Sequence, residues 1–174
     1  EMCIRDSSTD DPKIAEISNM FNGNTPFMRP PELATDSALT IGVVQHAIEF
    51  MEKERGSKYD YVILLQPTSP LRTFKDIDKC IEKLINRDVN ACVSVVETSK
   101  SPYWMFELNE HENFIPVVKN TPLVSIRQNL PRTFGINGAV YVAKIDWYKK
   151  TKEFINEETI AYIMPKDLSL IHIS

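Results

Sequence analysis

Two apolar segments of strand length, with a helix-like segment between them, constrain the fold of this chain most strongly. Residues 61–65 (Tyr-Val-Ile-Leu-Leu) and 91–96 (Ala-Cys-Val-Ser-Val-Val) do not alternate between apolar and polar positions. Runs of this kind are typical of strands that are covered on both faces, as in a parallel sheet. Between them, residues 75–86 repeat apolar side chains at intervals of three and four, which predicts a helix.

The alternation of strand and helix continues on both sides of this unit. Apolar positions at helical spacing predict a long helix that Gly56 closes, with Asp36 or Ser37 as its N-cap. We also expect a helix at 12–20, a short strand at 25–28, a buried strand at 138–143 and an edge strand at 160–164. This order predicts an α/β fold, a three-layer sandwich with a mostly parallel sheet and right-handed crossovers.

Composition narrows the class of protein. A chain of 174 residues that is 43% hydrophobic can bury one sizeable core, so one domain is predicted. The net charge of −4 argues against a nucleic-acid-binding face, but it leaves a small anionic substrate possible. We find neither a membrane-length apolar run nor a secretory signal, which predicts a cytoplasmic protein without a membrane partner.

Common catalytic and metal-binding motifs are missing from the sequence. There is no GxSxG, HExxH or GxxxxGK[ST] motif, and five glycines provide no glycine-rich triphosphate cradle. Cys3, Cys80 and Cys92 lack zinc-site or disulfide-framework spacing, and the last two are expected to be buried thiols. His46 falls in an expected helix and His111 in an expected turn, so no general base and no catalytic residue is assigned.

A hairpin rich in aromatic side chains is predicted between residues 103 and 118, with a polar turn at 109–113. Its apolar side could pack on the sheet or on a second copy of the chain. We favour the second copy, and hence a homodimer, because a projecting aromatic hairpin has little else to cover it.

Polar residues gather where strands are expected to end, which is where ligands bind in such folds. Gln66-Pro-Thr-Ser-Pro-Leu-Arg72 forms a proline-stiffened loop with an amide, two hydroxyls and a guanidinium, suited to a hydroxyl-rich ligand. A plain strand-to-helix turn capped by Thr73 or Ser69 explains the same residues equally well.

Two further polar clusters are candidate binding segments. The first runs from Arg127 to Arg132 and precedes Asn137-Gly138; paired arginines suit a carboxylate or phosphate, although a solvated loop is the commoner fate of such residues. The second runs from Arg29 to Asp36, where Asp36 alone is better explained as a helix cap than as a catalytic acid.

Three motifs in these clusters resemble the acylneuraminate cytidylyltransferases, the CMP-sialic acid synthetases. They are Arg-Pro-x-Glu-Leu-Ala-x-Asp at 29–36, Leu-Leu-Gln-Pro-Thr-Ser-Pro-Leu-Arg at 64–72 and Asn-Gly-Ala-Val-Tyr at 137–141. The resemblance covers nearly all of residues 8–167. It implies a nucleotide-diphospho-sugar transferase-like fold, a dimerisation arm at about 103–118, and the joining of a sugar acid to CMP from CTP with Mg²⁺, releasing pyrophosphate.

The resemblance also implies roles for individual residues. Those expected near the cytosine nucleotide are Arg29, Asp36, Ala38 and Thr40. Those expected near the sugar acid are Gln66, Thr68, Ser69 and Arg72, with Arg127 and Gln128 on its carboxylate and Asn137 fixing the loop or touching the sugar. Legionaminic, pseudaminic or Kdo acids are alternatives to a sialic acid. A non-catalytic nucleotide- or sugar-binding module is the alternative of another class.

The two ends of the chain are related through their codons. Residues 1–7 can be encoded by DNA whose complementary strand encodes Leu-Ser-Leu-Ile-His-Ile-Ser, the sequence of residues 168–174, and this repeat resembles a transposon end used as a sequencing adapter. We therefore expect both segments to be non-native and residues 8–167 to be a partial cytidylyltransferase domain.

The resemblance implies that two catalytic parts of the family lie outside this native content. The family's phosphate loop should precede Ser8, and its Mg²⁺-binding Asp pair should follow shortly after Asp167. Neither is found at these places, since residues 168–174 contain no Asp. No metal ligand is therefore assigned, and the chain itself is expected to be inactive.

Overall fold

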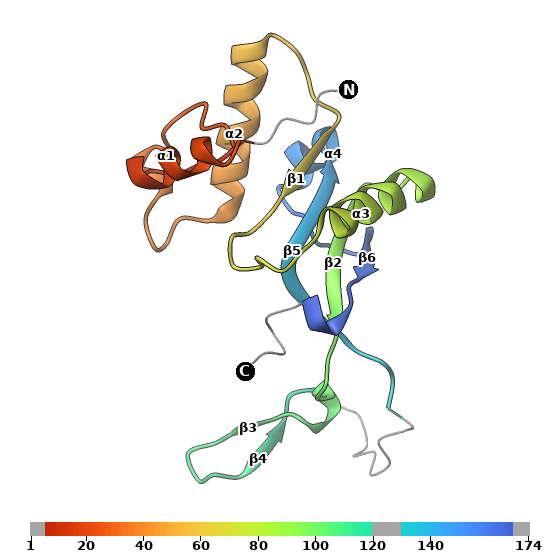
Figure 1. Ribbon diagram of the computed structural model, residues 1–174. Coiled ribbons are helices and arrows are strands. Elements are labelled where there is room, and N and C mark those ends of the chain that lie inside the picture. The colour runs from red at the N-terminus through yellow and green to blue at the C-terminus, as the bar shows by residue number, and fades with distance from the viewer. Residues whose placement is uncertain (1–5, 120–129, 169–174) are drawn as a thin grey trace. The chain divides into compact units, whose positions relative to one another are not determined.

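The computed structural model describes residues 6–119 and 130–168, and the chain divides into two compact units. The first comprises Glu1–Val62 and Ile145–Glu153, and the second comprises Ile63–Lys144 and Phe154–Ser174. The helices are α1 (Pro12–Met20), α2 (Thr40–Arg55), α3 (Phe74–Arg87) and α4 (Ile145–Thr151), with 3-10 turns η1 (Pro31–Leu33), η2 (Pro102–Trp104) and η4 (Lys166–Leu168) (Figure 1). The strands are β1 (Tyr61–Leu64), β2 (Ala91–Glu97), β3 (Phe106–Leu108), β4 (Phe114–Pro116), β5 (Phe134–Lys144) and β6 (Thr159–Ile163). No helix in the described ranges could span a membrane.

Helix α1 of the first unit begins and ends where the sequence predicts. The Asp11 carboxylate accepts a hydrogen bond from the backbone N–H of Lys13 at 2.7 Å, which caps the helix. Pro12 occupies the first helical position, where no N–H is needed. The helix ends at Met20.

The strand expected at 25–28 is reduced to isolated bridges. Thr9 pairs with Met28 and Asp6 pairs with Asn24, both in parallel orientation. The backbone N–H of Ser7 also donates to the carbonyl of Asn24 at 2.6 Å. Two bridges do not make a continuous ladder, so this part of the first unit is strand-like without forming a named strand.

The start of α2 corrects one prediction, because neither Asp36 nor Ser37 caps this helix. The N-cap is Leu39, which has no side chain that can cap the first turn. Asp36 and Ser37 lie in a preceding turn, in which the N–H of Ala38 donates to the carbonyl of Thr35 at 3.0 Å. This turn keeps Asp36 and Ser37 away from the N-terminus of α2, which one of them was expected to cap.

The end and the packing of α2 agree with the sequence pattern. Gly56 follows the helix with φ 62°, in the left-handed region that glycine adopts at little cost. An ion pair between Glu52 and Lys149, at 2.7 Å, joins α2 to α4 within the first unit. The buried side chains of α2 recur at helical spacing: Val44, Ile48 and Met51.

The chain contains a mixed sheet with the strand order β1-β5-β2-β6, of which β5, β2, β6 and the last two residues of β1 belong to the second unit. Strand β2 pairs parallel with β6 and antiparallel with β5, and α3 packs on these three strands. The α/β class is therefore confirmed. The core between α3 and the sheet contains Cys80, Leu84, Cys92, Ala139, Val140, Val142 and Met164. Cys80 and Cys92 are buried free thiols, as predicted.

Strand β1 differs from the prediction that it would be covered on both faces. It lies at an edge of the sheet, where Tyr61 is exposed and the other three residues are half-buried. Ile63 packs against the core cluster. The apolar run thus reflects one well-packed side of an edge strand, whereas the equally apolar β2 is central and almost fully buried.

A buried carboxylate ties the start of α3 to β6. Asp76 accepts hydrogen bonds from the backbone N–H and the hydroxyl of Thr73 at 2.8 and 2.7 Å, and from the Tyr162 hydroxyl at 3.1 Å. Burial alone would raise the pKa of Asp76, but these hydrogen bonds outweigh it and hold that pKa below its ordinary value. Burial and the bond to Asp76 raise the pKa of Tyr162 to about 12.

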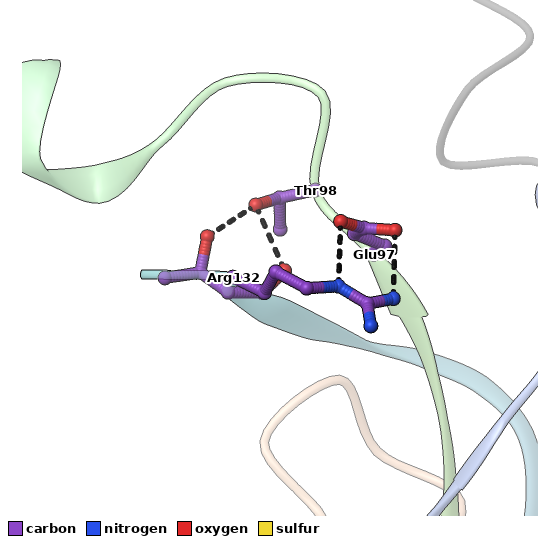
Figure 2. Close-up of polar contacts among 4 residues, drawn as sticks. Glu97, Thr98 and Arg132 are labelled. Carbon is purple, nitrogen blue, oxygen red and sulfur yellow. Dashed lines mark hydrogen bonds and ion pairs between the residues drawn. The ribbon is translucent and has the colours of Figure 1, made fainter. Parts of the chain in front are cut away.

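The predicted hairpin is present as β3 and β4, which pair antiparallel. The hairpin lies between the end of β2 and the start of β5 in the chain. Side-chain contacts join the end of β2 to the start of β5 (Figure 2). Arg132 donates two hydrogen bonds to Glu97, each 3.1 Å, and these bonds lower the pKa of the Glu97 carboxyl. The hydroxyls of Thr98 and Thr133 lie 2.7 Å apart, and the N–H of Thr98 donates to the carbonyl of Thr133 at 2.9 Å.

Removing the buried charge tests the link between α3 and β6. We expect Asp76→Asn to lower the free energy of unfolding by roughly 1–3 kcal/mol at pH 7, since hydrogen bonds to a charged acceptor are worth that much. Because the pKa of Asp76 is lowered by folding, its contribution is complete above the ordinary pKa of about 4 and is lost as the pH falls through the folded value.

Urea unfolding at neutral and acidic pH measures this effect, with Asp78→Asn as the control. Asp78 is an exposed carboxylate in the same helix. A deficit in Asp76→Asn that is equally large well below pH 4 would contradict the assignment.

Candidate functional site

The second unit brings the predicted Gln66–Arg72 loop to Asn137. The loop after β1 meets β5 through the Ser69 hydroxyl, which donates to the backbone carbonyl of Asn137 at 2.8 Å. Ser69 and Asn137 are both buried. The contact joins residues 68 positions apart, so the Gln66–Arg72 loop is more than a plain turn into α3.

Asn137 lies in a bulge of β5, and its amide is used inside the protein. The register of the β2–β5 pairing shifts here. Val93 faces Tyr141 and Val95 faces Ile136, so one β2 residue, Ser94, lies opposite the four β5 residues 137–140. The Asn137 side-chain oxygen accepts hydrogen bonds from the Ser94 hydroxyl at 2.7 Å and from the N–H of Ala139 at 3.2 Å. Its amide nitrogen contacts the sulfur of Met164 at 3.2 Å. Asn137 therefore shapes the backbone.

Arg72 braces the same loop from its other end. One terminal nitrogen of its guanidinium donates to the carbonyls of Gln66 at 2.5 Å, Ser69 at 3.2 Å and Ala139 at 3.3 Å. Burial lowers the pKa of Arg72. A single cation thus holds three carbonyls from two separate segments of the chain.

Gln66 and Thr68 remain available to a ligand. Gln66 is half-buried and Thr68 exposed, and neither side chain has a hydrogen-bond partner within residues 6–119 and 130–168. The Gln66 side chain lies against Gly138, where an added Cβ would come within 2.5 Å of its oxygen. Gly138 has φ 71°, which favours glycine for a second reason.

The residues expected near the nucleotide lie in the first unit. The Arg29 guanidinium donates from Nε to the Ser8 hydroxyl at 3.1 Å and also to the Ser8 carbonyl. Asp36 is exposed, Ala38 closes the turn before α2, and Thr40 is the first residue of that helix. These four positions occupy one short stretch of chain, as the sequence motif suggests.

Two of the predicted sugar-binding residues have no structural description. Arg127 and Gln128, expected on the sugar carboxylate, lie outside the described residues. Their role in binding stays a prediction that rests on the family motif.

The described residues around Asp167 do not form a metal site. Asp167 is exposed within η4, the last element of the described chain, and the Asp pair for Mg²⁺ was expected to follow it. Residues 168–174 contain no Asp, and those from 169 onward lie outside the described residues. In the part that the structure does describe, no three His, Cys, Asp or Glu side chains are grouped so that they could hold a metal ion. Asp167 is therefore one exposed carboxylate, and no Mg²⁺ ligand is assigned among the described residues.

Sequence reasoning missed Ser94. Its hydroxyl is fully buried, donates to Asn137 and accepts from the N–H of Val140 at 2.8 Å. A single hydroxyl inside an otherwise apolar strand was the available signal, because a buried polar group needs partners. Which partners it has depends on the bulge, which the sequence pattern does not reveal.

Relatives of known name cover nearly the whole chain, although no family model matches it. Post-translational flagellin modification protein B of Campylobacter coli is 28% identical over 92% of this chain and 71% of its own length. An N-acylneuraminate cytidylyltransferase of Streptococcus agalactiae is 31% identical over 94% of this chain, which spans 38% of that protein. A CMP-N,N'-diacetyllegionaminic acid synthase of Legionella pneumophila is 30% identical, covering 87% of this chain and 64% of the relative.

A solved structure shows the same fold. It is a CMP:2-keto-3-deoxy-manno-octonic acid synthetase complexed with CTP, with a TM-score of 0.59 and 13% identity over 94% of this chain and 73% of that one. The chain thus shares the fold of that synthetase. The relatives of the chain include proteins named N-acylneuraminate cytidylyltransferase and CMP-N,N'-diacetyllegionaminic acid synthase, at 27–31% identity.

Replacing the Arg72 cation tests its bracing role. We expect Arg72→Met to destabilise the protein by roughly 1–3 kcal/mol, because three carbonyls lose a charged donor. Hydrogen–deuterium exchange should rise in the peptide covering residues 66–73. Arg87→Met removes an exposed arginine from the end of α3 and is the control. Unchanged exchange in the loop would show that Arg72 does not brace it.

Proposed function

We propose that the chain is part of an enzyme that activates a sugar acid with CTP, giving the CMP-sugar and pyrophosphate. The observation that carries this proposal is the match to several enzymes named for this chemistry over about nine-tenths of the chain. Because the chain spans only 38% and 64% of two of these relatives, the activity is proposed for the whole protein.

The contacts of the β1–α3 loop support a division of roles within the proposed sugar site. Gln66 and Thr68 carry the free polar groups and are proposed to bind hydroxyl or acyl groups of the sugar acid. Ser69, Arg72 and Asn137 are committed to contacts inside the protein, so we assign them to shaping the loop. Their place in the family motif then reflects the loop's geometry.

The remaining assignments follow the family motifs. Arg127 and Gln128 are proposed to hold the sugar carboxylate, since a guanidinium can donate two parallel hydrogen bonds to it. The segment that contains Arg29, Asp36, Ala38 and Thr40 is proposed to meet the cytosine nucleotide.

The proposed reaction requires the sugar acid and CTP to be held in a defined relative position. The anomeric hydroxyl of the sugar must attack the α-phosphate of CTP in line, so catalysis consists mainly of alignment and neutralisation of phosphate charge. We include Mg²⁺ in the proposal as the source of part of that neutralisation. No metal ligand is assigned among the described residues, and no step is assigned to the metal.

Two alternatives define what an assay must distinguish. The relatives include enzymes named for N-acylneuraminic, legionaminic and pseudaminic acids, so the particular sugar acid is the first open choice. A non-catalytic nucleotide- or sugar-binding module would bind the same ligands without releasing pyrophosphate.

Pyrophosphate release from the whole protein tests the proposal. We expect release with CTP and one of four sugar acids: N-acetylneuraminic, legionaminic, pseudaminic or Kdo. Gln66→Ala should raise the KM for that acid by about tenfold, the cost of one lost hydrogen bond. Asn86→Ala removes an exposed amide elsewhere in the same unit and should leave the KM unchanged. Binding without release would favour the non-catalytic module.

We also propose that the hairpin forms a homodimer contact. Its apolar side chains are largely exposed, with Leu108 60%, Phe114 73% and Val117 48% accessible. The rings of Phe106 and Phe114 are in contact across the hairpin, with centroids 5.0 Å apart and planes tilted by 33°. An exposed apolar patch of this kind is typical of a protein–protein contact.

A charge placed in this surface should separate the two copies. We expect Phe114→Asp to convert a dimer of the whole protein into a monomer, because a carboxylate is costly to bury in an apolar contact. Light scattering measures the mass, and Glu110→Lys in the polar turn serves as the control. A wild-type protein that is already monomeric would contradict the proposal.

A further inference from the structure

Ser94 is the one polar residue in the buried run of β2, and it lies opposite the bulge of β5. Its side chain is fully buried and forms two short hydrogen bonds, one given to the Asn137 amide and one accepted from Val140. The β2 residues on either side of Ser94 face Tyr141 and Ile136, so four β5 residues, 137–140, lie opposite this single residue. The hydroxyl therefore provides the partners that a regular strand pair would have supplied.

The bulge lies next to the Gln66 side-chain amide of the candidate site. Gly138 stands at its centre with φ 71°, and the Gln66 side chain rests against it. An added Cβ on Gly138 would also approach the Ser69 hydroxyl to 3.6 Å. The position of the Gln66 amide is thus set by a surface whose shape depends on the bulge.

We infer that Ser94 is a positioning residue for Gln66: it holds the Asn137–Val140 bulge, and the bulge seats the Gln66 amide for the sugar acid. This inference rests on the proposed function, because it gives the Gln66 amide a substrate to meet. Ser94 itself is buried behind the bulge and is assigned no contact with the substrate.

A purely structural role for Ser94 makes a different prediction. Loss of the hydroxyl leaves Asn137 and the N–H of Val140 each short of one buried partner, so some loss of stability follows in either case. Only a positioning role also moves the Gln66 amide and changes sugar binding selectively. The test therefore needs readouts other than stability.

The matched variants are Ser94→Ala and Thr98→Ala. Ser94 bonds to Asn137 inside the sheet, and Thr98, the residue after β2, bonds to Thr133, the residue before β5, so each variant removes one bonded hydroxyl. In the NMR spectrum of the chain, we expect the Gln66 side-chain amide signals to shift in Ser94→Ala and to stay in place in Thr98→Ala. In the whole protein, Ser94→Ala should raise the KM for the sugar acid about tenfold while the KM for CTP is unchanged.

Gly138→Ala provides an independent route to the same displacement, because its Cβ would meet the Gln66 amide while the Ser94 hydroxyl stays in place. We expect it to reproduce the rise in KM, and the double variant with Ser94→Ala to add less than the sum of the two effects. Unmoved Gln66 signals or an unchanged sugar KM in Ser94→Ala, with stability lost as in Thr98→Ala, would overturn the inference.

Failure of the proposed function has a separate signature. In that case the wild-type protein releases no pyrophosphate with any of the sugar acids, whatever happens to the Gln66 signals. A shift of those signals in Ser94→Ala would then still support the positioning of the amide, and only its substrate would be wrong.

Discussion

The hydrogen bonds of the β2–β5 bulge are the constraint on which the candidate site depends. A bulge leaves backbone groups without their ladder partners, and in a buried sheet each unpaired group is costly. Here the Asn137 amide oxygen and the Ser94 hydroxyl accept hydrogen bonds from backbone N–H groups of the bulge and also bond to each other. The irregular backbone is therefore retained inside a close-packed core. Within the same irregular segment, Gly138 lacks a side chain, and the Gln66 side chain occupies the space that a Cβ would need.

The loop that faces this bulge is rigid because it is held at both ends. Arg72 draws the carbonyls of Gln66, Ser69 and Ala139 together, and Asp76 fixes the start of α3 through Thr73. Rigid loops lose little conformational entropy when a ligand binds. The two free groups, on Gln66 and Thr68, therefore belong to a preorganised segment. In such a segment, affinity depends on the match between loop and ligand.

The sequence predicted the parts of the fold that local pattern determines. Helices α1 and α3 and strand β2 were placed within one or two residues and the hairpin within three, because each has its own periodicity, cap or turn. The N-cap of α2 was placed wrongly because Asp36 and Ser37 satisfy the capping pattern but lie in a separate turn. The coverage of β1 was wrong because an edge position depends on pairings that are distant in sequence.

The candidate site could also be predicted only in part from the sequence. The sequence marked the Gln66–Arg72 loop and Asn137 as candidate site residues, but their contact depends on the position of Asn137 inside β5, where a strand start was expected. The contacts of Ser69 and Arg72 with backbone carbonyls inside the protein could not be predicted. The same side chain in the same sequence motif can donate either to a ligand or to the backbone. Ser94 escaped notice because its importance comes from a change of register between two strands, one of which is more than forty residues away.

The paired contacts at the neck of the hairpin have a consequence for how this fold can vary. Glu97 with Arg132 and Thr98 with Thr133 close the loop at its base, on the hairpin side of the bulge. Once a loop is closed in this way, the entropy of closure grows only with the logarithm of its length, about 0.6 kcal/mol for each doubling. Insertions and deletions beyond the neck are therefore inexpensive and leave the sheet register intact. The arm can be remodelled for a new partner while the bulge keeps its shape.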